Sequence, residues 1–470
     1  MKQIMGFKLF TIVSLFSIGS CNGNRNSKTD EVINDKEFFI AAYGTNYTEA
    51  GLYGCQTSDS GFVLTGVTTA YTLGQEALRV IKVDKFGNIQ WEATYGTESI
   101  ESGYSIIETA NHQYVICGHS GLYGETDHDV LLLRIDNRGN LLWSKLMGGD
   151  DYDYGTDVLE LIDGSLILAG YSYSYGSGKD DLFLAKFSAD GDSLWTKIYG
   201  GLLNEHGYSV EHTSDNGFIL VGFTKSFNNN FYRNVPIDPI QNPDECFYDV
   251  YVIKTDSVGD TLWTRTYGGN GHDRGQSVQE TKDSCYIITG HSTGFDDESD
   301  ILLLKINTDG KLLWSKIYST KYIDASYAVS ETADGGFIIT GETGYNEEGI
   351  LRTAGLLIRT NSLGELLWSK KVIMDGGNTI LYNGGITFNS GYFAVGKTLL
   401  KHDEAFDLIF LSLDSNGNTS SNLPTSDIAC KSVELDAHFT TTIISAGLDF
   451  KKHLLKRDVV DCESFFFNLP

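Results

Sequence analysis

A unit of about fifty residues that recurs seven times, in a chain rich in β-formers and turn residues, predicts an all-β fold, a seven-bladed β-propeller with four-stranded blades. The 470 residues include 52 glycines, 26 tyrosines and 25 phenylalanines but only five prolines. This composition is typical of short strands joined by tight turns. A lone strand pattern at the N-terminus indicates how the ring closes.

The tryptophans mark the repeat. Each of the six follows a turn glycine by four residues, as in GNLLW and GDTLW, and neighbouring tryptophans are about fifty residues apart except across one longer interval. A seventh unit ends near Gly417 without its tryptophan, so the spacing of the repeat predicts seven blades. We expect the six rings to form a packing layer on the outer strands: Trp91, Trp143, Trp195, Trp263, Trp314 and Trp368.

Each unit contains four strand patterns, which we name A to D from the propeller axis outward. GYSV, GFILVG, DLFLAKF and SLWTKIYG are examples of A, B, C and D, and each is rich in β-branched or aromatic residues. Turns such as Asp256 to Asp260 separate C from D, and their glycine predicts a hairpin with a positive φ.

The N-terminal segment 37–44, EFFIAAYG, has the D pattern but no unit of its own. The seventh unit lacks that strand, so we expect the N-terminal strand to complete blade seven and the propeller to span residues 37–418. Closure of this kind removes the exposed sheet edges of an open array.

The first 21 residues predict export. Lys2 and Lys8 precede an apolar run that is too short for a membrane helix. The segment Ile18-Gly19-Ser20-Cys21 that ends this run resembles a bacterial lipobox. This resemblance implies lipidation of Cys21. Residues 22–36 are polar and read as a flexible tether. We expect a cell-envelope protein that contacts the membrane through its lipid alone, and by resemblance to other lipoproteins we expect the outer membrane.

Residues 419–470 fall outside the repeat. We expect a C-terminal extension that packs on the propeller, with a possible disulfide between Cys430 and Cys462 in an oxidising compartment. Cys55, Cys117 and Cys285 read as free thiols in strands. The cysteines form no CxxC pair, so neither a metal site nor a cofactor is expected.

The formal charge of −27 argues against nucleic acid as a partner, because phosphate binding needs clustered lysine and arginine. No GxSxG, HExxH or phosphate-loop motif occurs, and no residue is assigned a catalytic role.

The strings GGDDYDYGTDV, GGNGHDRGQSV and DILLLKINTDGKLLW resemble the bacterial seven-bladed β-propeller repeat family found in exported proteins of Bacteroidetes-type bacteria. The resemblance covers residues 37–418 and implies the fold, but it implies no single function. The Gly-x-x-x-Trp strand also bears a distant resemblance to quinoprotein-like propellers. Adjacent cysteines and an eighth blade are missing here, so no quinone cofactor is expected.

An acidic residue stands two positions before the residue that opens strand A in six units. These carboxylates could form a cation- or substrate-facing ring, but a residue that every repeat requires serves the repeat. We therefore interpret them as structural acceptors of backbone N–H groups. The ring comprises Glu49, Glu101, Asp153, Glu205, Asp273 and Asp324.

Candidate ligand-binding residues are expected where the repeat loses its symmetry. The fourth unit carries an insertion between strands B and C, residues 225–248, and we expect deletion of 228–245 to spare the fold and abolish ligand binding. The B-to-C loops are also predicted to hold Tyr171, His119, His128 and His291. The candidate ligand contacts are Tyr71, Tyr123, Tyr173, Tyr175, Phe231, Tyr232, Phe295 and Tyr345.

Aromatic side chains beside carboxylates and amides suit a glycan or a protein partner. The sequence thus favours a monomeric binding or scaffold module of the cell envelope. Two alternatives remain open: a glycoside hydrolase, which needs two carboxyl groups at a fixed separation, and a purely structural component of a surface assembly.

Overall fold

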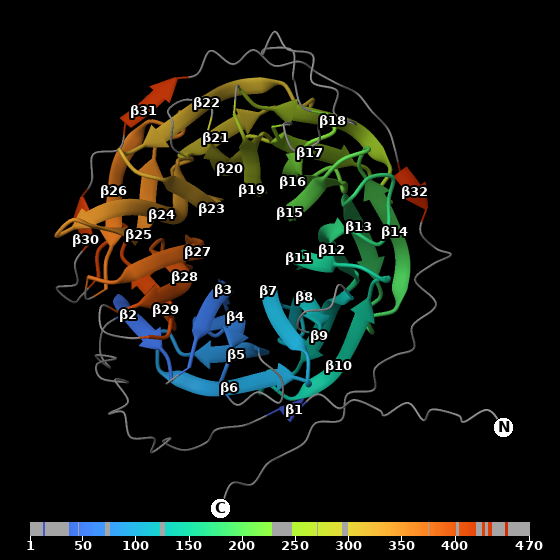
Figure 1. Ribbon diagram of the computed structural model, residues 1–470, viewed down its shortest axis with the longest axis horizontal. Coiled ribbons are helices and arrows are strands. Elements are labelled where there is room, and N and C mark those ends of the chain that lie inside the picture. The colour runs from blue at the N-terminus through green and yellow to red at the C-terminus, as the bar shows by residue number, and fades with distance from the viewer. Residues whose placement is uncertain are drawn as a thin grey trace, which may run out of the picture.

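The computed structural model describes residues 37–419, except 46, 71–75, 123–126, 228–246, 270, 294–298, 375 and 401–403, together with short strands at 13–14, 425–427, 431–434 and 447–449. Seven antiparallel sheets surround a central axis as a closed ring, and no helix occurs among the described residues (Figure 1). The predicted all-β, seven-bladed β-propeller is confirmed.

Each blade contains strands A, B, C and D in order from the axis outward. Blades one and two are β3 (Glu49–Gln56), β4 (Phe62–Thr68), β5 (Ala77–Val83), β6 (Ile89–Gly96), and β7 (Ile100–Glu108), β8 (Tyr114–Gly121), β9 (His128–Ile135), β10 (Leu141–Met147). Blades three and four are β11 (Asp153–Glu160), β12 (Leu166–Ser172), β13 (Asp181–Phe187), β14 (Ser193–Tyr199), and β15 (Glu205–His212), β16 (Phe218–Thr224), β17 (Asp249–Thr255), β18 (Thr261–Tyr267). Blades five and six are β19 (Asp273–Glu280), β20 (Tyr286–Ser292), β21 (Asp300–Ile306), β22 (Leu312–Ser319), and β23 (Asp324–Glu331), β24 (Phe337–Glu347), β25 (Ile350–Thr360), β26 (Leu366–Val372).

Blade seven joins the two ends of the ring. It consists of β27 (Asn378–Ile386), β28 (Tyr392–Leu399), β29 (Asp407–Leu413) and, on the outside, β2 (Phe39–Tyr43). Strand β2 pairs antiparallel with β29, from Phe39 opposite Ser412 to Tyr43 opposite Leu408. The prediction that the N-terminal strand completes the last blade is therefore confirmed.

The hydrophobic core lies between neighbouring blades. One cluster, for example, joins Val63 and Val80 of blade one to Ile106, Ile116 and Leu133 of blade two, all of them fully buried. Comparable clusters occupy the other six seams, including the one between blades seven and one. Because each blade shares its core with both neighbours, closure of the ring buries apolar surface on every sheet.

The tryptophans connect consecutive blades. The ring of Trp195 packs against Gly259, the glycine of the next blade's C-to-D turn, whose φ is +79°. An added Cβ on Gly259 would lie 3.0 Å from the ring, so the turn needs glycine for both its backbone conformation and its packing. Phe39 of β2 occupies the same place against Gly87, which explains how a strand without tryptophan closes the ring.

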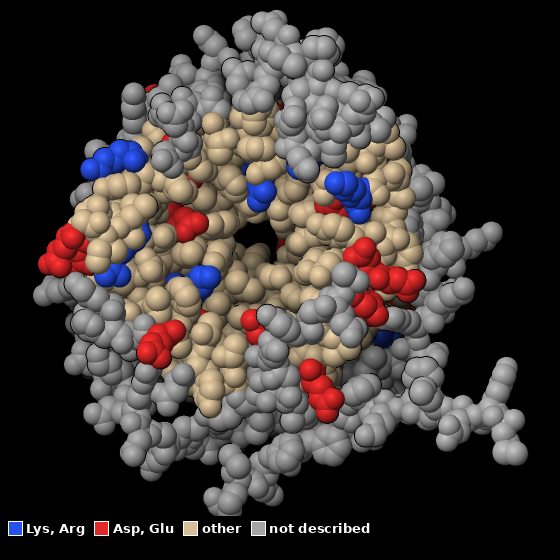
Figure 2. Space-filling view, viewed as in Figure 1, with Lys and Arg blue, Asp and Glu red and all other residues tan. Residues whose placement is uncertain are grey.

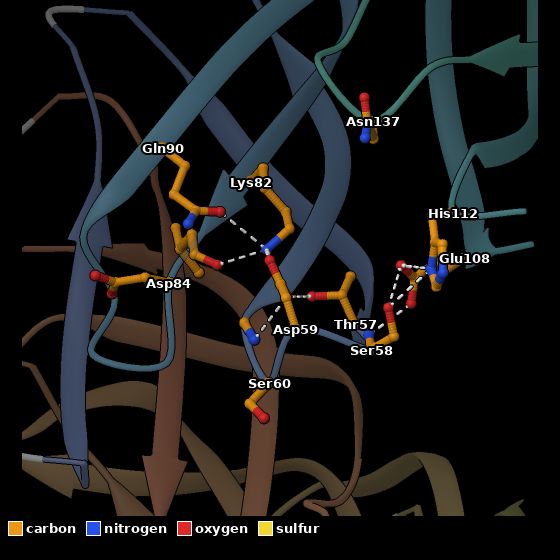
Figure 3. A network of polar contacts seen from close by, with 12 residues as sticks. Thr57, Ser58, Asp59, Ser60, Lys82, Asp84, Gln90, Glu108, His112 and Asn137 are labelled. Atoms are coloured by element: carbon orange, nitrogen blue, oxygen red, sulfur yellow. Dashed lines mark hydrogen bonds and ion pairs between the residues drawn. The ribbon is translucent and has the colours of Figure 1, made fainter.

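Two faces of the propeller differ in their connections. The turn face carries the tight A-to-B and C-to-D turns, and the loop face carries the B-to-C and D-to-A connections. On the turn face the ammonium group of Lys82 lies 2.9 Å from Oδ2 of Asp59, and the backbone N–H of Ser58 donates to Glu108 of blade two at 2.6 Å (Figure 3).

Other blades repeat this network. Buried or half-buried basic side chains meet the aspartate of their own A-to-B turn in the pairs Lys186–Asp163, Lys254–Asp215, Lys305–Asp283 and Arg359–Asp334. The turn of one blade likewise donates to a carboxylate of the next in the pairs Ala110–Glu160, Ser214–Glu280 and Lys282–Glu331. The turn face is thus a symmetric structural layer.

Short strands from outside the repeat add to the outer edges of four blades. The chain end contributes β30 (Thr425–Asp427) to β26, β31 (Lys431–Glu434) to β22 and β32 (Gly447–Asp449) to β14. The segment β1 (Val13–Ser14) pairs with β6. Each added strand pairs antiparallel with a D strand, which otherwise ends its sheet with unpaired backbone groups.

Candidate functional site

The predicted ring of carboxylates lies on the loop face, at the start of the A strands, directly after the D-to-A connections. Each carboxylate accepts the backbone N–H of the residue four positions earlier, over distances from 2.6 Å at Asp324 to 3.2 Å at Glu49. All six side chains are buried: Glu49, Glu101, Asp153, Glu205, Asp273 and Asp324.

Burial raises the pKa of five of these carboxyl groups, and the pKa of Asp273 reaches about 6. Threonine and serine hydroxyls of strand B supply further hydrogen bonds, as from Thr224 to Glu205 at 2.7 Å. The carboxylates therefore point into the blades and link D-to-A connections to strand B, and they offer no open ring to a ligand.

A different set of side chains forms the mouth of the axial channel. It consists of the residue that follows the repeated acid in strand A and the residue that follows the glycine of strand B. Register places these two residues opposite each other in every blade, as with Tyr154 and Tyr171 in blade three and His206 and Phe223 in blade four.

The aromatic members of this set run from His119 of blade two to Phe223 of blade four. His119 meets Tyr154 edge-on at 4.9 Å between ring centroids, Tyr154 stacks on Tyr171 at 5.0 Å, and Tyr171 stacks on His206 at 3.8 Å with an interplanar angle of 3°. Phe223 follows 4.5 Å from His206. We call this continuous row of five rings the aromatic arc.

The remaining members of this set break the row. They hold Arg274 and His291 in blade five and small, aliphatic or charged residues elsewhere. Those remaining positions are Ala325, Glu342, Ile380, Lys397, Ala50, Val67 and Ser102. The loop face is therefore asymmetric where the turn face is repetitive.

His206 is the most strongly oriented ring of the arc. Its Nε2 contacts the carboxylate of Asp180, a fully buried residue that precedes β13. Its Nδ1 lies 3.3 Å from the hydroxyl of Tyr208, two residues along β15. A carboxylate at Nε2 favours the proton on that nitrogen, which leaves Nδ1 to accept from the Tyr208 hydroxyl.

His119 and His128 lie parallel at the other end of the arc, with centroids 5.3 Å apart and an angle of 8°. They are 6% and 8% exposed, and Nδ1 of each has no hydrogen-bond partner among the described residues. Burial, with the neighbouring His128, lowers the pKa of His119 to about 3. His119 is therefore a neutral aromatic ring at physiological pH.

The prediction that three histidines and Tyr171 lie in the B-to-C loops is wrong. His119, Tyr171 and His291 lie within strand B, and His128 begins strand C. Strand B extends past its glycine because its next serine or threonine donates to the buried carboxylate, as from Ser120 to Glu101 at 3.2 Å.

A cavity of about 580 Å³ lies on the axis and is lined by the A strands of all seven blades. Tyr171 and Tyr208 line it, so the arc and the cavity share a wall. The channel passes through the ring in Figure 2, and most of the surface around the opening is uncharged. An extra residue bulges from each A strand near this level, which turns neighbouring side chains toward the axis.

Two carboxyl groups in this cavity are perturbed. Burial raises the pKa of Asp157 to about 6, although its carboxylate accepts hydrogen bonds from Val210 N–H at 3.0 Å and Ser105 Oγ at 3.0 Å. Burial, and then the charges of Asp157 and Glu280, raises the pKa of Glu211 to about 7. Both groups can therefore exchange protons near neutral pH.

Three of the eight predicted ligand contacts lie in the described part of the chain. Tyr173, 36% exposed, flanks the arc beside Tyr171 and Tyr152. Tyr175 donates its hydroxyl proton to the carbonyl of Gly148, and Tyr345 donates to that of Gly377, so both hydroxyls serve the fold. Tyr71, Tyr123, Phe231, Tyr232 and Phe295 lie outside the described residues, as do 228–246, Cys21, Cys430 and Cys462.

Sequence reasoning missed Tyr154, His206, Phe223 and Arg274. Each occupies a variable position directly beside a repeated one, between the acid and glycine of strand A or after the glycine of strand B. The signal was available in an alignment of the seven units, because DYG, EHG and DRG all keep an acid and a glycine but differ in type at the position between them.

The described cysteines Cys55, Cys117 and Cys285 are unpaired, and Cys285 lies just before β20 rather than in a strand. Across the described ranges, no group of three or more metal-ligating side chains comes together. Within those same ranges, no helix has the length and apolar character needed to cross a membrane.

One family model matches the chain, over residues 163–192, with the description "Domain of unknown function (DUF5122) beta-propeller". The matched segment covers strands B and C of blade three. Together with the observed ring of seven blades, this match confirms the resemblance to a bacterial seven-bladed β-propeller family.

The regulatory protein FlaEY of Caulobacter vibrioides is 28% identical over 134 residues, which is 25% of this chain. The chain spans only 14% of that relative's length. Among solved structures, a Dyadobacter fermentans protein of unknown function covers 66% of this chain, and 94% of its own length, at 11% identity and a TM-score of 0.44.

A fungal alcohol oxidase of the AA5 family, in complex with copper, covers 82% of this chain and 78% of its own length at 11% identity and a TM-score of 0.46. An endo-1,5-alpha-L-arabinanase of Thermotoga petrophila covers 79% of this chain and 99% of its own length at 11% identity and a TM-score of 0.29. At these values no activity passes from either enzyme to this chain.

Proposed function

We propose that the protein is a binding module of the cell envelope that holds a glycan along the aromatic arc, and that the lipid on Cys21 anchors it to the outer membrane. The observation that carries this proposal is the arc itself. Its five aromatic side chains contact one another in a row at the mouth of the axial channel, and they come from blades two to four only.

Aromatic rings suit sugars because they pack against the apolar C–H faces, while hydroxyl and imidazole groups bond to the sugar hydroxyls. Tyr154, Tyr171 and His206 are only half-buried, and Tyr173 and Tyr152 extend the aromatic surface outward. The axial cavity adjoins the arc and can accept one end of a chain.

The hydrolase alternative rests on one feature, the carboxyl pair Asp157 and Glu211 in the cavity. Glycoside hydrolysis uses one protonated and one ionised carboxyl group, and pKa values of about 6 and about 7 place both groups in the right range. In that reading Glu211 is the acid and Asp157, which accepts two hydrogen bonds, is the base or nucleophile.

The test is a glycan-array screen of the full-length protein in detergent, followed by chromatography of any retained polysaccharide after incubation with the protein. We expect retention of at least one glycan without release of shorter products. Release that disappears in Glu211→Gln would establish the hydrolase instead. Failure to retain any glycan would contradict both readings and point to a protein partner.

A further inference from the structure

Arg274 stands at the end of the aromatic arc, at the strand-A position that His206 occupies one blade earlier. Its guanidinium carbon lies 4.4 Å from the ring centroid of Tyr248 and 5.0 Å from that of Phe223. Aromatic faces hold a guanidinium in place without using its N–H donors.

No hydrogen bond or ion pair joins Arg274 to another residue in the part of the chain that the structure describes, and its Nε is buried without a partner. Four other described arginines are neutralised by carboxylates, in the pairs Arg79–Glu92, Arg134–Glu160, Arg352–Glu347 and Arg359–Asp334. In a chain of net charge −27, an arginine that keeps its donors unused at a channel mouth calls for an external anion.

The two rings that Arg274 contacts, Tyr248 and Phe223, offer it no carboxylate. His291 lies opposite it on β20, and burial followed by the charge of Arg274 lowers the pKa of His291 to about 4. The next carboxylate along the chain, Asp273, is turned into the blade, where it accepts the N–H of Gly269 at 2.8 Å. The positive charge is therefore felt at the mouth and is not cancelled by these neighbours.

We propose that Arg274 binds the carboxylate of an acidic sugar, so that the arc selects a uronic-acid-containing glycan. This inference rests on the proposed function and specifies its ligand. A planar guanidinium matches a carboxylate with two parallel N–H donors, and the pair is strongest where one side is shielded from water, as the Tyr248 and Phe223 rings shield it here.

The experiment compares polygalacturonate with its fully methyl-esterified form, which keeps the sugar backbone and removes the charge. Affinity electrophoresis of the full-length protein gives the two dissociation constants. We expect the wild type to bind the free acid about tenfold more tightly, in line with one charge-assisted pair. Arg274→Met should bind both forms equally, and Arg274→Lys should keep part of the preference.

Arg265→Met is the matched control, because it removes one arginine charge from the outer strand β18, where the side chain bonds to the carbonyls of Thr264 and Asp309. It should keep the wild-type preference. A melting curve for each variant confirms that the fold is intact.

Equal binding of acid and ester by the wild type would overturn the role of Arg274 and leave the glycan-binding function standing. The same preference in Arg274→Met as in the wild type would overturn it too, as would tighter binding to a sulfated galactan than to polygalacturonate. If the protein retains no glycan of any kind, the proposed function itself fails.

Discussion

The turn face and the loop face of this propeller are built from the same strands but use their variable positions differently. On the turn face, buried lysines and arginines meet the aspartate of their own blade's turn, and carboxylates of one blade cap the turn of another. On the loop face the equivalent positions run from aromatic to basic to aliphatic around the ring.

This difference teaches that a residue repeated in every blade serves the fold, whereas a position that varies between blades is a candidate for ligand binding. A contact that each seam requires recurs in each repeat, whereas a ligand of finite size meets only some of the blades. The ring of acids satisfies the first description, and the aromatic arc satisfies the second. Substitutions on the two faces should therefore separate stability from binding.

The largest loss of stability is expected when a tryptophan that packs between two blades near the turn face is removed. Trp195→Ala removes the ring that packs on Gly259 of the next blade, and we expect the free energy of unfolding to fall by about 3 kcal/mol. Urea denaturation measures this loss. Trp195→Phe should recover most of the stability, because Phe39 fills the same place against Gly87. An alanine variant as stable as the wild type would contradict the packing account.

A smaller and uniform effect is expected at the inter-blade caps. Glu108→Ala and Glu280→Ala each remove a carboxylate that accepts the N–H and the hydroxyl of a serine in another blade, Ser58 or Ser214. Each should cost about 1–2 kcal/mol in thermal or urea unfolding. Equal losses in the two variants would support the symmetry of the turn face. A loss in one variant but not in the other would contradict it.

The channel carboxyl Glu211 should make stability depend on pH. Its pKa rises from 4.5 to about 7 on folding, so the stability that its protonated form contributes is present at low pH and is lost as the pH rises through about 7. Glu211→Gln should therefore be more stable than the wild type at pH 8 and equally stable near pH 4. We expect a difference of only about 1 kcal/mol at pH 8, because water still reaches the half-buried side chain and screens its charge.

Unfolding of both proteins at pH 4, 6 and 8 measures this dependence. A glutamine variant that is less stable than the wild type at pH 8 would show that the carboxylate is stabilised, not penalised, by the channel.

The smallest effect on stability is expected on the loop face. Tyr173 is the most exposed of the rings that flank the arc, and Tyr173→Ala should change the free energy of unfolding by less than about 0.5 kcal/mol. The same variant should bind the retained glycan several-fold more weakly in affinity electrophoresis. A variant with lowered stability and unchanged binding would reverse the assignment of the two faces.

Most of the fold could be predicted because its determinants are local and repeated. The turn glycine and tryptophan mark each C-to-D hairpin, and the D pattern of residues 37–44 indicated the closure that β2 and β29 form. The end of strand B was predicted too early, since the hydrogen bond that extends it, as from Ser120 to Glu101, joins residues of different strands.

The candidate site could be predicted only in part. Tyr173 was selected for its aromatic character in an irregular segment, whereas Tyr154 and His206 lie inside regular strands and resemble core residues in the sequence. Their meeting depends on the seam between blades, which brings strand A of one blade beside strand B of another. No spacing within a single repeat contains that information.

The most direct test of the central claim compares two equivalent strand-B positions, Tyr171 in the arc and Val67 in blade one, outside the arc. The measurement is the dissociation constant of the full-length protein for the glycan that the array retains. We predict that Tyr171→Ala weakens binding at least tenfold and that Val67→Ala leaves it within twofold. Equal losses in the two variants, or undiminished binding by Tyr171→Ala, would contradict the account.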